Sequence, residues 1–207
     1  MFRKETWYGE QADRNSAYFW VPLIAAHSGM RLEEIVRLRP MHDVTEKCGI
    51  PCFSIQPHPD GWNPKTEAGR RLVPIHSFLI ELGFLDFVGS RTTEPYLFND
   101  LKSGGPDGKR GYQFSREFSR AKIKLGVAKK TTFHSFRHSA RTMLTNTEVE
   151  LFRDAWIDAV MGHDAEEGQS EGVQTYTKRI DIENLRKVVE HIRPLIDLRG
   201  LLPVQNH

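Results

Sequence analysis

The sequence predicts a mostly α-helical domain of the α+β class, with a small three-stranded antiparallel β-sheet inserted after the second helix. Two observations lead to this prediction. Apolar residues recur at intervals of three and four over most of the chain, which is typical of amphipathic helices. Between residues 41 and 76 the period changes to short alternating segments separated by Gly and Pro, which is typical of strands. At 207 residues and 39% hydrophobic content, the chain is long enough to build one well-buried core.

The elements are expected in the following order along the chain. The first helix has a cap at Asn15 or Ser16, continues to about His27 and ends at Gly29, and the second covers 32–38 and stops at Pro40. Three strands then follow over 41–45, 52–55 and 71–75, with turns at 47–51 and 60–69. Helical periodicity resumes over 77–87, 115–125, 134–146 and 151–161, and an apolar stripe at 182–195 marks a last helix, capped by Asp181.

Composition indicates one intracellular domain. Residues 1–15 are interpreted as a lead-in, 16–198 as the domain core and 199–207 as a tail. Two cysteines cannot form a disulfide framework, so a reducing, cytoplasmic setting is expected. The longest apolar run, 19–26, is too short to span a membrane, and the amino terminus lacks the apolar core of a signal peptide. No membrane association is therefore expected.

The net charge of +2 hides two opposed blocks. Residues 109–141 contain ten Lys or Arg and one acid, Glu117, whereas residues 142–172 contain eight acids and one arginine, Arg153. Five aromatic residues are interleaved with the basic block, at positions 112, 114, 118, 133 and 136. This pattern is typical of a surface that follows a phosphate backbone, although a solvated helix face lying over core aromatics would have the same composition.

The densest candidate site is 133–138, at the start of a predicted helix. His134 and Arg137 stand three residues apart, so they project from one helix face and can bind a single anionic group. A cap at Thr131 or Thr132 would expose backbone donors at the same place. Two alternatives remain open, namely ordinary surface pairing and a metal pair formed by His134 with His138.

Four further positions carry candidate chemistry, and each also has a structural interpretation. Arg31 follows a glycine turn and can be held by Glu34 one helical turn later, although this pair is equally a simple salt bridge. Lys65 lies in the predicted turn before the third strand, where lysines are usually solvated. His163 follows Gly162 at a helix end, where histidines commonly contact the last carbonyls. Tyr176, 13 residues further on, is otherwise a core tyrosine.

The order of these motifs resembles the catalytic domain of tyrosine recombinases, the phage integrase family. Gly-x-Arg-x-x-Glu at 29–34, a hairpin lysine, His-x-x-Arg at 134–137, Gly-His at 162–163 and a later tyrosine occur in sequence over most of the chain. The resemblance implies the DNA breaking-rejoining fold of that family. It also implies that Arg31, His134 and Arg137 bind the scissile phosphate and that His163 donates a hydrogen bond to it. Lys65 would be the general acid, Tyr176 the nucleophile and Glu34 a support for Arg31.

The same resemblance implies the remaining functional expectations. The expected partner is double-stranded DNA. The protein is expected to form a homo-tetramer on DNA in its active assembly and to be a monomer in isolation. Neither a cofactor nor a metal is expected to take part. The reaction would be integration or excision of a phage or other mobile element. A separate amino-terminal core-binding domain, usual in the family, is expected to be absent. DNA contacts are expected from the basic block, at Lys109, Arg110, Arg116, Arg120, Lys129, Lys130 and Arg141.

Several alternatives remain open at this stage. The chain could be a DNA-binding module without catalysis, or it could pass strands as the similar type IB topoisomerases do. Cys48 and Cys52, with His58 or His76, could bind a structural zinc instead of packing as reduced thiols. The acidic stretch 164–172 is expected to form a mobile tether for Tyr176.

Overall fold

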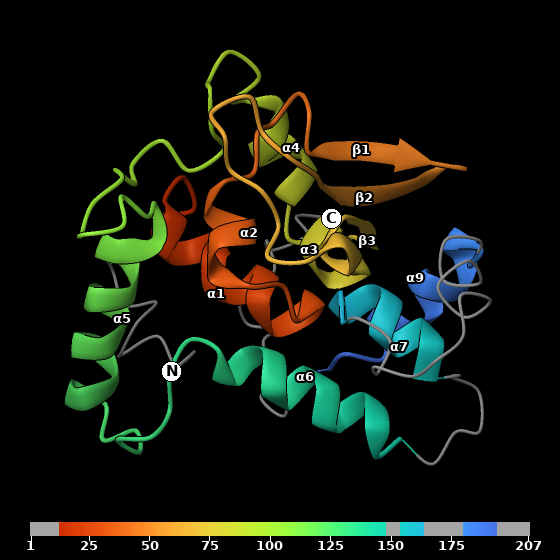
Figure 1. Cartoon of the computed structure of the whole chain (residues 1–207). Helices are drawn as coiled ribbons and strands as arrows, with labels where there is room; N and C mark the ends of the chain where they lie inside the picture. The colour runs from red at the N-terminus through yellow and green to blue at the C-terminus, as the bar shows by residue number, and fades with distance from the viewer. Residues whose placement is uncertain (1–12, 148–153, 164–179, 194–207) are drawn as a thin grey trace, which may run out of the picture.

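The computed structural model describes residues 13–147, 154–163 and 180–193, and over these residues the chain has the predicted α+β architecture (Figure 1). The three strands are β1 (Val44–Lys47), β2 (Ile50–Ile55) and β3 (Arg71–Pro74). A short 3-10 helix, Glu67–Gly69, precedes β3. The described α-helices are α1 (Ala17–Ser28), α2 (Leu32–Val36), α3 (Ser77–Glu81), α4 (Phe84–Gly89), α5 (Gly111–Lys124), α6 (Ser135–Thr145), α7 (Asp154–Met161) and α9 (Ile182–Glu190).

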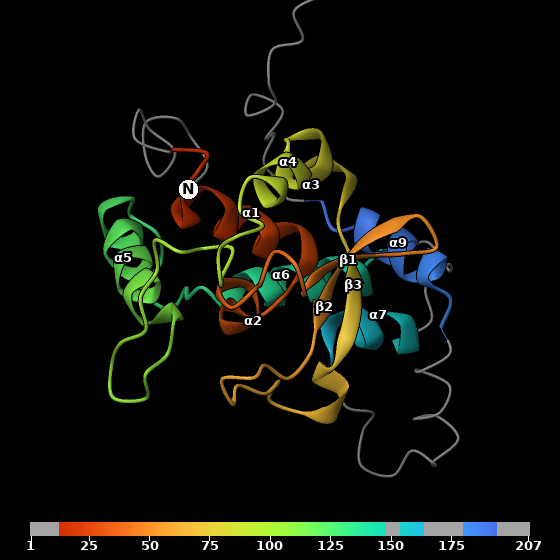
Figure 2. The same ribbon diagram turned by 90° about the horizontal axis from the view of Figure 1, so that it is seen from above.

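Helix α1 forms the centre of the core. Nearly all of its side chains are buried, because α2, α3, α6 and α9 pack around it. A helix that is apolar on every face is stable only when it is covered in this way. Trp20 of α1 packs edge-to-face against Phe84, and Phe84 in turn contacts Phe53 of β2. Figure 2 shows α1 between α2 and the α3–α4 pair.

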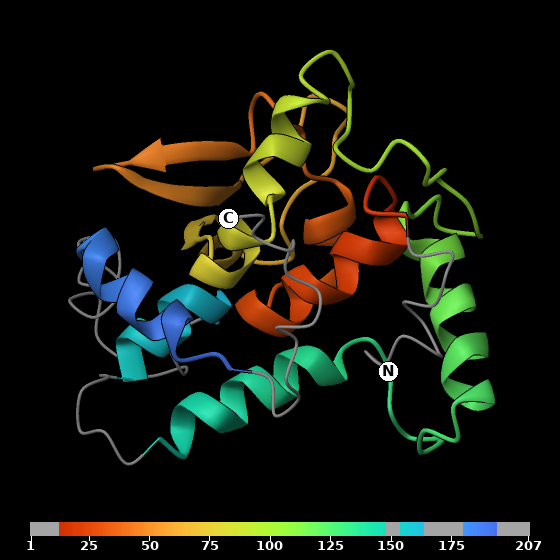
Figure 3. The ribbon, with the colours of Figure 1, turned by 180° about the vertical axis from the view of Figure 1, so that it is seen from behind.

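The sheet is an antiparallel meander in the order β1-β2-β3. Phe53 is the central residue of the register, because it pairs with Val44 on one side and with Val73 on the other. Helices α7 and α9 pack against β3, and Figure 3 shows α9 from behind, beside the sheet. The prediction of a three-stranded antiparallel sheet after the second helix is confirmed.

The first hairpin is displaced from its expected position. Its turn consists of Cys48 and Gly49 alone, so β1 ends at Lys47 and β2 begins at Ile50. Both turn residues have positive φ, 52° and 77°, as the right-handed twist of a two-residue hairpin requires. The prediction of a longer turn was wrong because Cys-Gly is not one of the usual sequence signals for this turn.

The helix expected over 77–87 is two helices. Gly83 adopts φ +92°, which interrupts the regular helical backbone and separates α3 from α4. The change of direction buries Phe84 and Phe87 against α1, and Trp20 contacts both rings.

The predicted cap of the first helix is confirmed at Ser16, whereas α5 and α6 begin differently from the prediction. Ser16 occupies the cap position of α1 without a side-chain bond, and the amide of Ala17 donates to Asp100 at 2.8 Å. Helix α5 begins four residues early, at Gly111, whose amide donates to Glu33 at 2.7 Å. His134, rather than a threonine, is the cap residue of α6, and its side chain makes no capping bond.

Helix α2 ends at Val36, two residues before the predicted end. The predicted start of α7 at residue 151 and the apolar stripe beyond residue 193 lie outside the described residues. Within the described ranges, no helix is both long and apolar enough to cross a membrane.

Gly29 closes α1 at φ +64° and lies against α7. A Cβ at this position would stand 2.8 Å from the end of the fully buried Met161 side chain. Gly126, beyond the end of α5, has the same backbone conformation at φ +65° with nothing within 4 Å of an added Cβ. Comparing substitutions at Gly29 and Gly126 therefore distinguishes the energetic cost of backbone strain from that of a packing overlap.

We expect Gly126→Ala to lower the free energy of unfolding by about 1–2 kcal/mol through backbone strain. Gly29→Ala should cost about 1–3 kcal/mol more, because the added Cβ would overlap the fully buried end of Met161 and lie 3.3 Å from Ala140 Cβ. Urea unfolding of both variants measures the difference. Equal losses would mean that α1 and α7 are not closely packed at this point.

Candidate functional site

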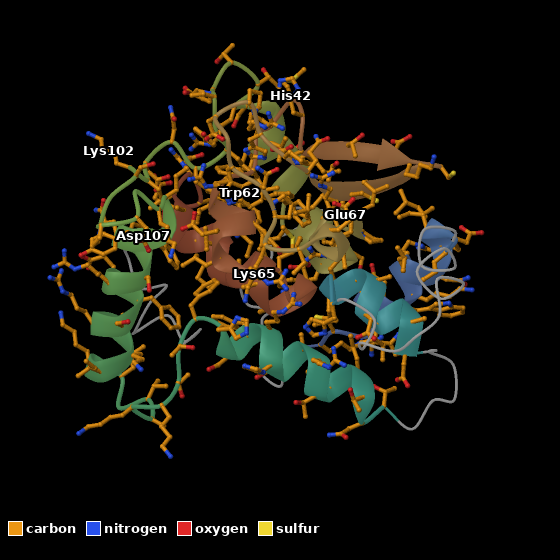
Figure 4. All side chains as sticks on the ribbon, in the orientation of Figure 1. His42, Trp62, Lys65, Glu67, Lys102 and Asp107 are labelled. Atoms are coloured by element: carbon orange, nitrogen blue, oxygen red, sulfur yellow. The ribbon has the colours of Figure 1, made fainter. Side chains whose placement is uncertain are left out.

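The ends of several segments that are distant in sequence converge in front of α1. These segments are the α1–α2 junction with Arg31, the β2–β3 loop with Lys65, the start of β3, the start of α6 with His134 and Arg137, and the end of α7 with His163 (Figure 1). Figure 4 shows Lys65 over the end of α1 and near the start of α6. Electrostatic interaction of His134 with Lys65, Arg31 and Arg137 places these four residues in one region.

Arg31 begins α2, and Glu34 holds it by both its backbone and its side chain. The Arg31 amide donates to Glu34 Oε2 at 2.9 Å, and its Nη1 donates to Glu34 Oε1 at 2.8 Å. Nη2 donates to the carbonyl of Gly162 at 3.2 Å. The side chain retains 23% exposure, so part of its guanidinium still faces solvent. Arg31 is therefore fixed in orientation and accessible to an anion.

Glu34 is a buried carboxylate that remains ionised. Its side chain is 3% exposed and accepts hydrogen bonds from two arginines, Arg31 and Arg71. Burial alone would raise its pKa, but Arg71 and then Arg31 outweigh burial and lower the pKa from 4.5 to about 2. The interpretation of Glu34 as a support for Arg31 matches these contacts, although the expected single pair is in fact a three-residue cluster.

Arg71, at the start of β3, is a site residue that the sequence reasoning missed. Its Nη1 and Nη2 donate to Glu34 Oε1 and Oε2 at 3.2 and 3.0 Å, and its Nε donates to the Val160 carbonyl at 2.8 Å. Strand periodicity contained the signal, because Arg71 shares a strand face with Val73 and Ile75, both buried. An arginine on the inner face of a strand requires an internal acceptor.

Arg137 is buried, with only 3% of its surface exposed, rather than lying on a solvent-facing side of its helix. Its Nη1 donates to the carbonyl of Gly29 at 3.0 Å and its Nη2 to the carbonyl of Met161. Burial is the main cause that lowers its pKa to about 10, and repulsion by Arg31 and Arg71 lowers it further. Since Glu34 only partly offsets these effects, the region has excess positive potential that an anion would stabilise.

Two histidines lie in this positive field. His134 is exposed and contacts His138 edge-to-face, with 4.7 Å between the ring centroids. Burial first, then His138, Arg137, Arg31 and Lys65, lower the pKa of His134. A shallow depression of about 250 Å³ adjoins this histidine, and its lining residues are Met30, Arg31, Leu32, Ser115, Thr132, Phe133 and His134.

His163 lies beyond the end of α7, where its Nδ1 contacts Arg141 and is 3.5 Å from Asp158 Oδ1. Burial and then Arg137 and Arg141 lower its pKa, against the opposite effect of Asp158. The ring is about one-third exposed, so it remains accessible to a ligand. Tyr176 and the acidic stretch 164–172 lie outside the described residues.

The basic block forms an exposed surface along α5 and the loop after it. Lys109 and Arg120 pair with neighbouring acids, Asp107 and Glu117, at 2.8 Å each, while both remain 59% exposed. Such surface pairs contribute little and can exchange for phosphate contacts. Arg116, Lys129 and Lys130 are also exposed. These five residues are called the α5 basic surface below.

Two predicted DNA contacts lie elsewhere. Arg110 is buried, where it donates to the carbonyls of Val36 and Phe98 at 3.2 and 2.9 Å and stacks on Tyr96. Its prediction as a DNA contact is therefore wrong, because its guanidinium is occupied inside the fold. Arg141 pairs with Asp158 at 2.9 Å beside His163 and so belongs to the converging cluster rather than to the α5 basic surface.

The alternative metal sites have few ligands in the described part of the chain. No group of three or more His, Cys, Asp or Glu side chains converges there. Cys52 is buried and Cys48 is exposed at the hairpin turn. His58 donates from Nε2 to the buried Asp43 at 3.1 Å, and His134 contacts only one other histidine, His138.

Comparison of the sequence and structure with models of known protein families, with curated proteins and with solved structures found no match in any of the three. The functional interpretation therefore rests on the motifs and on the geometry described above.

The lowered pKa of Glu34 leads us to expect that the free energy of unfolding depends on pH in a specific way. Because its pKa is lower in the folded protein than in the unfolded chain, the stabilisation is complete above about pH 4.5 and is lost as pH falls towards 2. The stability difference between the wild type and Glu34→Gln should narrow by roughly 2 kcal/mol between pH 5 and pH 3. Urea unfolding at the two pH values measures this change, and a constant difference would contradict an ionised, arginine-bound Glu34.

Proposed function

We propose that this chain is the catalytic domain of a tyrosine-type site-specific DNA recombinase, with the DNA breaking-rejoining fold of that family. One observation carries the proposal. Four segments carry, in the order typical of the family, Arg31, Lys65, the pair His134 and Arg137, and His163. The charges of these segments act on one another, and together they form one positively charged region. Glu34, the acid at its centre, is already neutralised by arginines.

Such a region suits a phosphodiester. Attack on phosphorus builds negative charge on the non-bridging oxygens, and guanidinium and imidazole donors held in place stabilise that charge. Arg31 supplies its solvent-facing donors, since Glu34 and Gly162 use the others. Arg137 has five N–H groups, of which two N–H···O=C bonds account for only part. His134 and His163 add imidazole donors at the edges of the region.

The proposed reaction conserves bond energy. The Tyr176 hydroxyl gives its proton to solvent and its oxygen attacks the scissile phosphorus, the bond from phosphorus to the 5′ oxygen breaks, and Lys65 supplies the proton that this oxygen requires. The product is a 3′-phosphotyrosyl enzyme and a free 5′-hydroxyl. Because the phosphotyrosyl ester retains a competent leaving group, attack by a 5′-hydroxyl of the partner strand reverses the step and rejoins DNA. Neither a metal nor a nucleotide cofactor is required by this chemistry.

The α5 basic surface would bind the DNA backbone beside the site. Two of its residues, Arg116 and Arg120, lie on α5, the helix that also lines the depression next to His134 through Ser115. Lys122 supports this arrangement from inside, because its buried ammonium binds the carbonyls of Lys129 and Thr131 and shapes the loop that presents Lys129 and Lys130. In the assembled state we propose a tetramer on two DNA duplexes that integrates or excises a mobile element, acting in the cytoplasm.

The nucleophile is tested with nicked suicide duplexes that carry candidate attachment sites, analysed on denaturing gels. The wild type should form a covalent protein–DNA adduct, and Tyr176→Phe should abolish it. Tyr112→Phe is the matched control, because Tyr112 is an exposed tyrosine on α5 and its loss should leave the adduct unchanged.

Other outcomes separate the alternative functions. An adduct that persists in Tyr176→Phe would refute the assigned nucleophile. Tight DNA binding by a wild type that never forms an adduct would indicate a catalytically silent DNA-binding module. Relaxation of supercoiled DNA without strand exchange would indicate strand passage of the type IB topoisomerase kind.

The α5 basic surface is tested by the salt dependence of DNA binding. Replacing both Lys129 and Lys130 with alanine should make the slope of log K against log salt shallower by about one to two units, because each phosphate contact contributes about 0.9. Lys47→Ala is the control, since this exposed lysine lies on the β1–β2 hairpin, far from α5 (Figure 1). Equal slopes for the two variants would place the DNA elsewhere.

A further inference from the structure

Three arginines cap the carboxyl end of α7 by donating hydrogen bonds to its last carbonyls. Arg71 of β3 donates to the carbonyl of Val160, Arg137 of α6 to that of Met161, and Arg31 of α2 to that of Gly162. The last carbonyls of a helix have no partners within the helix and form the negative end of its dipole, so cationic donors stabilise them. The turn that leads to His163 is therefore bound by the same guanidinium groups that form the proposed phosphate site.

Arg71 has a buried side chain, as Arg137 does, but unlike Arg137 it also binds the carboxylate of Glu34. Its side chain is 6% exposed and makes four hydrogen bonds, two with Glu34 and one each with the carbonyls of Val160 and Gly69. It links three parts of the site: the carboxylate that holds Arg31, the end of α7, and the end of the loop that carries Lys65. Its guanidinium is the common partner of all three.

Gly162 provides a second, independent sign of this role. Its φ is +63°, and an added Cβ would lie 2.7 Å from Arg71 Nη1 and 2.9 Å from Cζ. The guanidinium of Arg71 and the Ala68 carbonyl, which would be 3.0 Å from the added Cβ, thus leave room only for glycine at this position. The Gly-His turn and Arg71 fit each other sterically as well as through hydrogen bonds.

We propose that Arg71 is a positioning residue of the strand-transfer site, which orients Arg31 through Glu34 and holds the Gly162–His163 turn in register with it. The catalytic part of this inference rests on the proposed function, whereas the positioning part does not. Bidentate pairing of Arg71 with Glu34 leaves the carboxylate only one geometry in which it can also bind Arg31. Small displacements of such groups can lower reaction rates by about 100-fold.

Loss of Arg71 has a predictable electrostatic effect on Glu34. The charged groups that face this carboxylate are Arg31 from its own helix, Arg71 from β3 and Arg137 from α6. Without Arg71, burial would oppose the charge on Glu34 with only Arg31 as a direct partner, so its pKa should rise. Protonated Glu34 would then release Arg31, and the reaction would slow as pH falls.

The experiment compares Arg71→Met and Arg71→Lys with the wild type, and the lysine variant retains the charge if the methionine variant does not fold. Titration of the Glu34 carboxyl carbon by NMR measures its pKa, and the Arg31 Nε–H resonance reports its orientation. We expect the Glu34 pKa to rise by at least one unit in Arg71→Met and by less in Arg71→Lys, with the Arg31 resonance displaced in both. The rate of adduct formation should fall by about 100-fold in Arg71→Met. In this variant the rate should also decrease as pH falls, because Glu34 becomes protonated.

Arg110→Met is the matched control, because Arg110 is also buried and binds backbone carbonyls, including that of Val36 in α2, but is not among the groups that bind the Glu34 carboxylate. It should destabilise the fold without changing the Glu34 titration or the pH profile. An unchanged Glu34 pKa and Arg31 resonance in both Arg71 variants would overturn the positioning role. If the wild type forms no adduct on any duplex, the proposed function fails, while the two NMR measurements still decide whether Arg71 positions Arg31.

Discussion

Glu34 is an ionised carboxylate inside the protein, and it remains ionised because Arg31 and Arg71 both bind it. A buried carboxylate without such partners would be expected to become neutral. The pairing has structural consequences on three sides: it fixes the start of α2, it ties β3 to α2, and through Arg71 it holds the end of α7. The positively charged region in front of α1 depends on this cluster, because the cluster leaves Arg31 oriented and partly exposed while Arg137 stays buried behind it.

The sequence predicted the class of fold because its strongest signals are local. The burial of α1 follows from an apolar run that ends at a glycine, and the meander follows from alternation between turn residues. Features set by distant contacts could not be predicted in this way. Asp100 accepts from the first amide of α1 and Glu33 from that of α5, and both acids are distant in sequence from the helix that they support. Cys48 in a positive-φ turn is a case in which tertiary pairing outweighs local preference.

The candidate site likewise has parts that local sequence signals predicted and parts that depend on distant contacts. The motif order located Arg31, His134, Arg137, His163 and Lys65, and the structure brings the segments that carry them together. Charge counting could not distinguish a solvated arginine from a buried one, so it placed Arg110 on the DNA-binding surface although Arg110 is inside the fold. It also passed over Arg71, whose position on the inner strand face becomes meaningful only once its carboxylate partner is known. Burial and partner, rather than residue type, separate the arginines that build the site from those available to a ligand.

The central claim is that this region receives a DNA phosphate, and the histidines in it are direct probes of that claim. Neighbouring cations lower the pKa values of His134 and His163 in the free protein, after the effect of burial. A bound phosphate would offset those cations, so NMR titration of the imidazoles should show both pKa values rising when duplex DNA is added at low salt. The imidazole chemical shifts of His42, which is exposed and lies apart from Lys65 at the top of Figure 4, should not change when the DNA is added. If DNA binds and the pKa values of His134 and His163 stay the same, the phosphate lies elsewhere and the account is wrong.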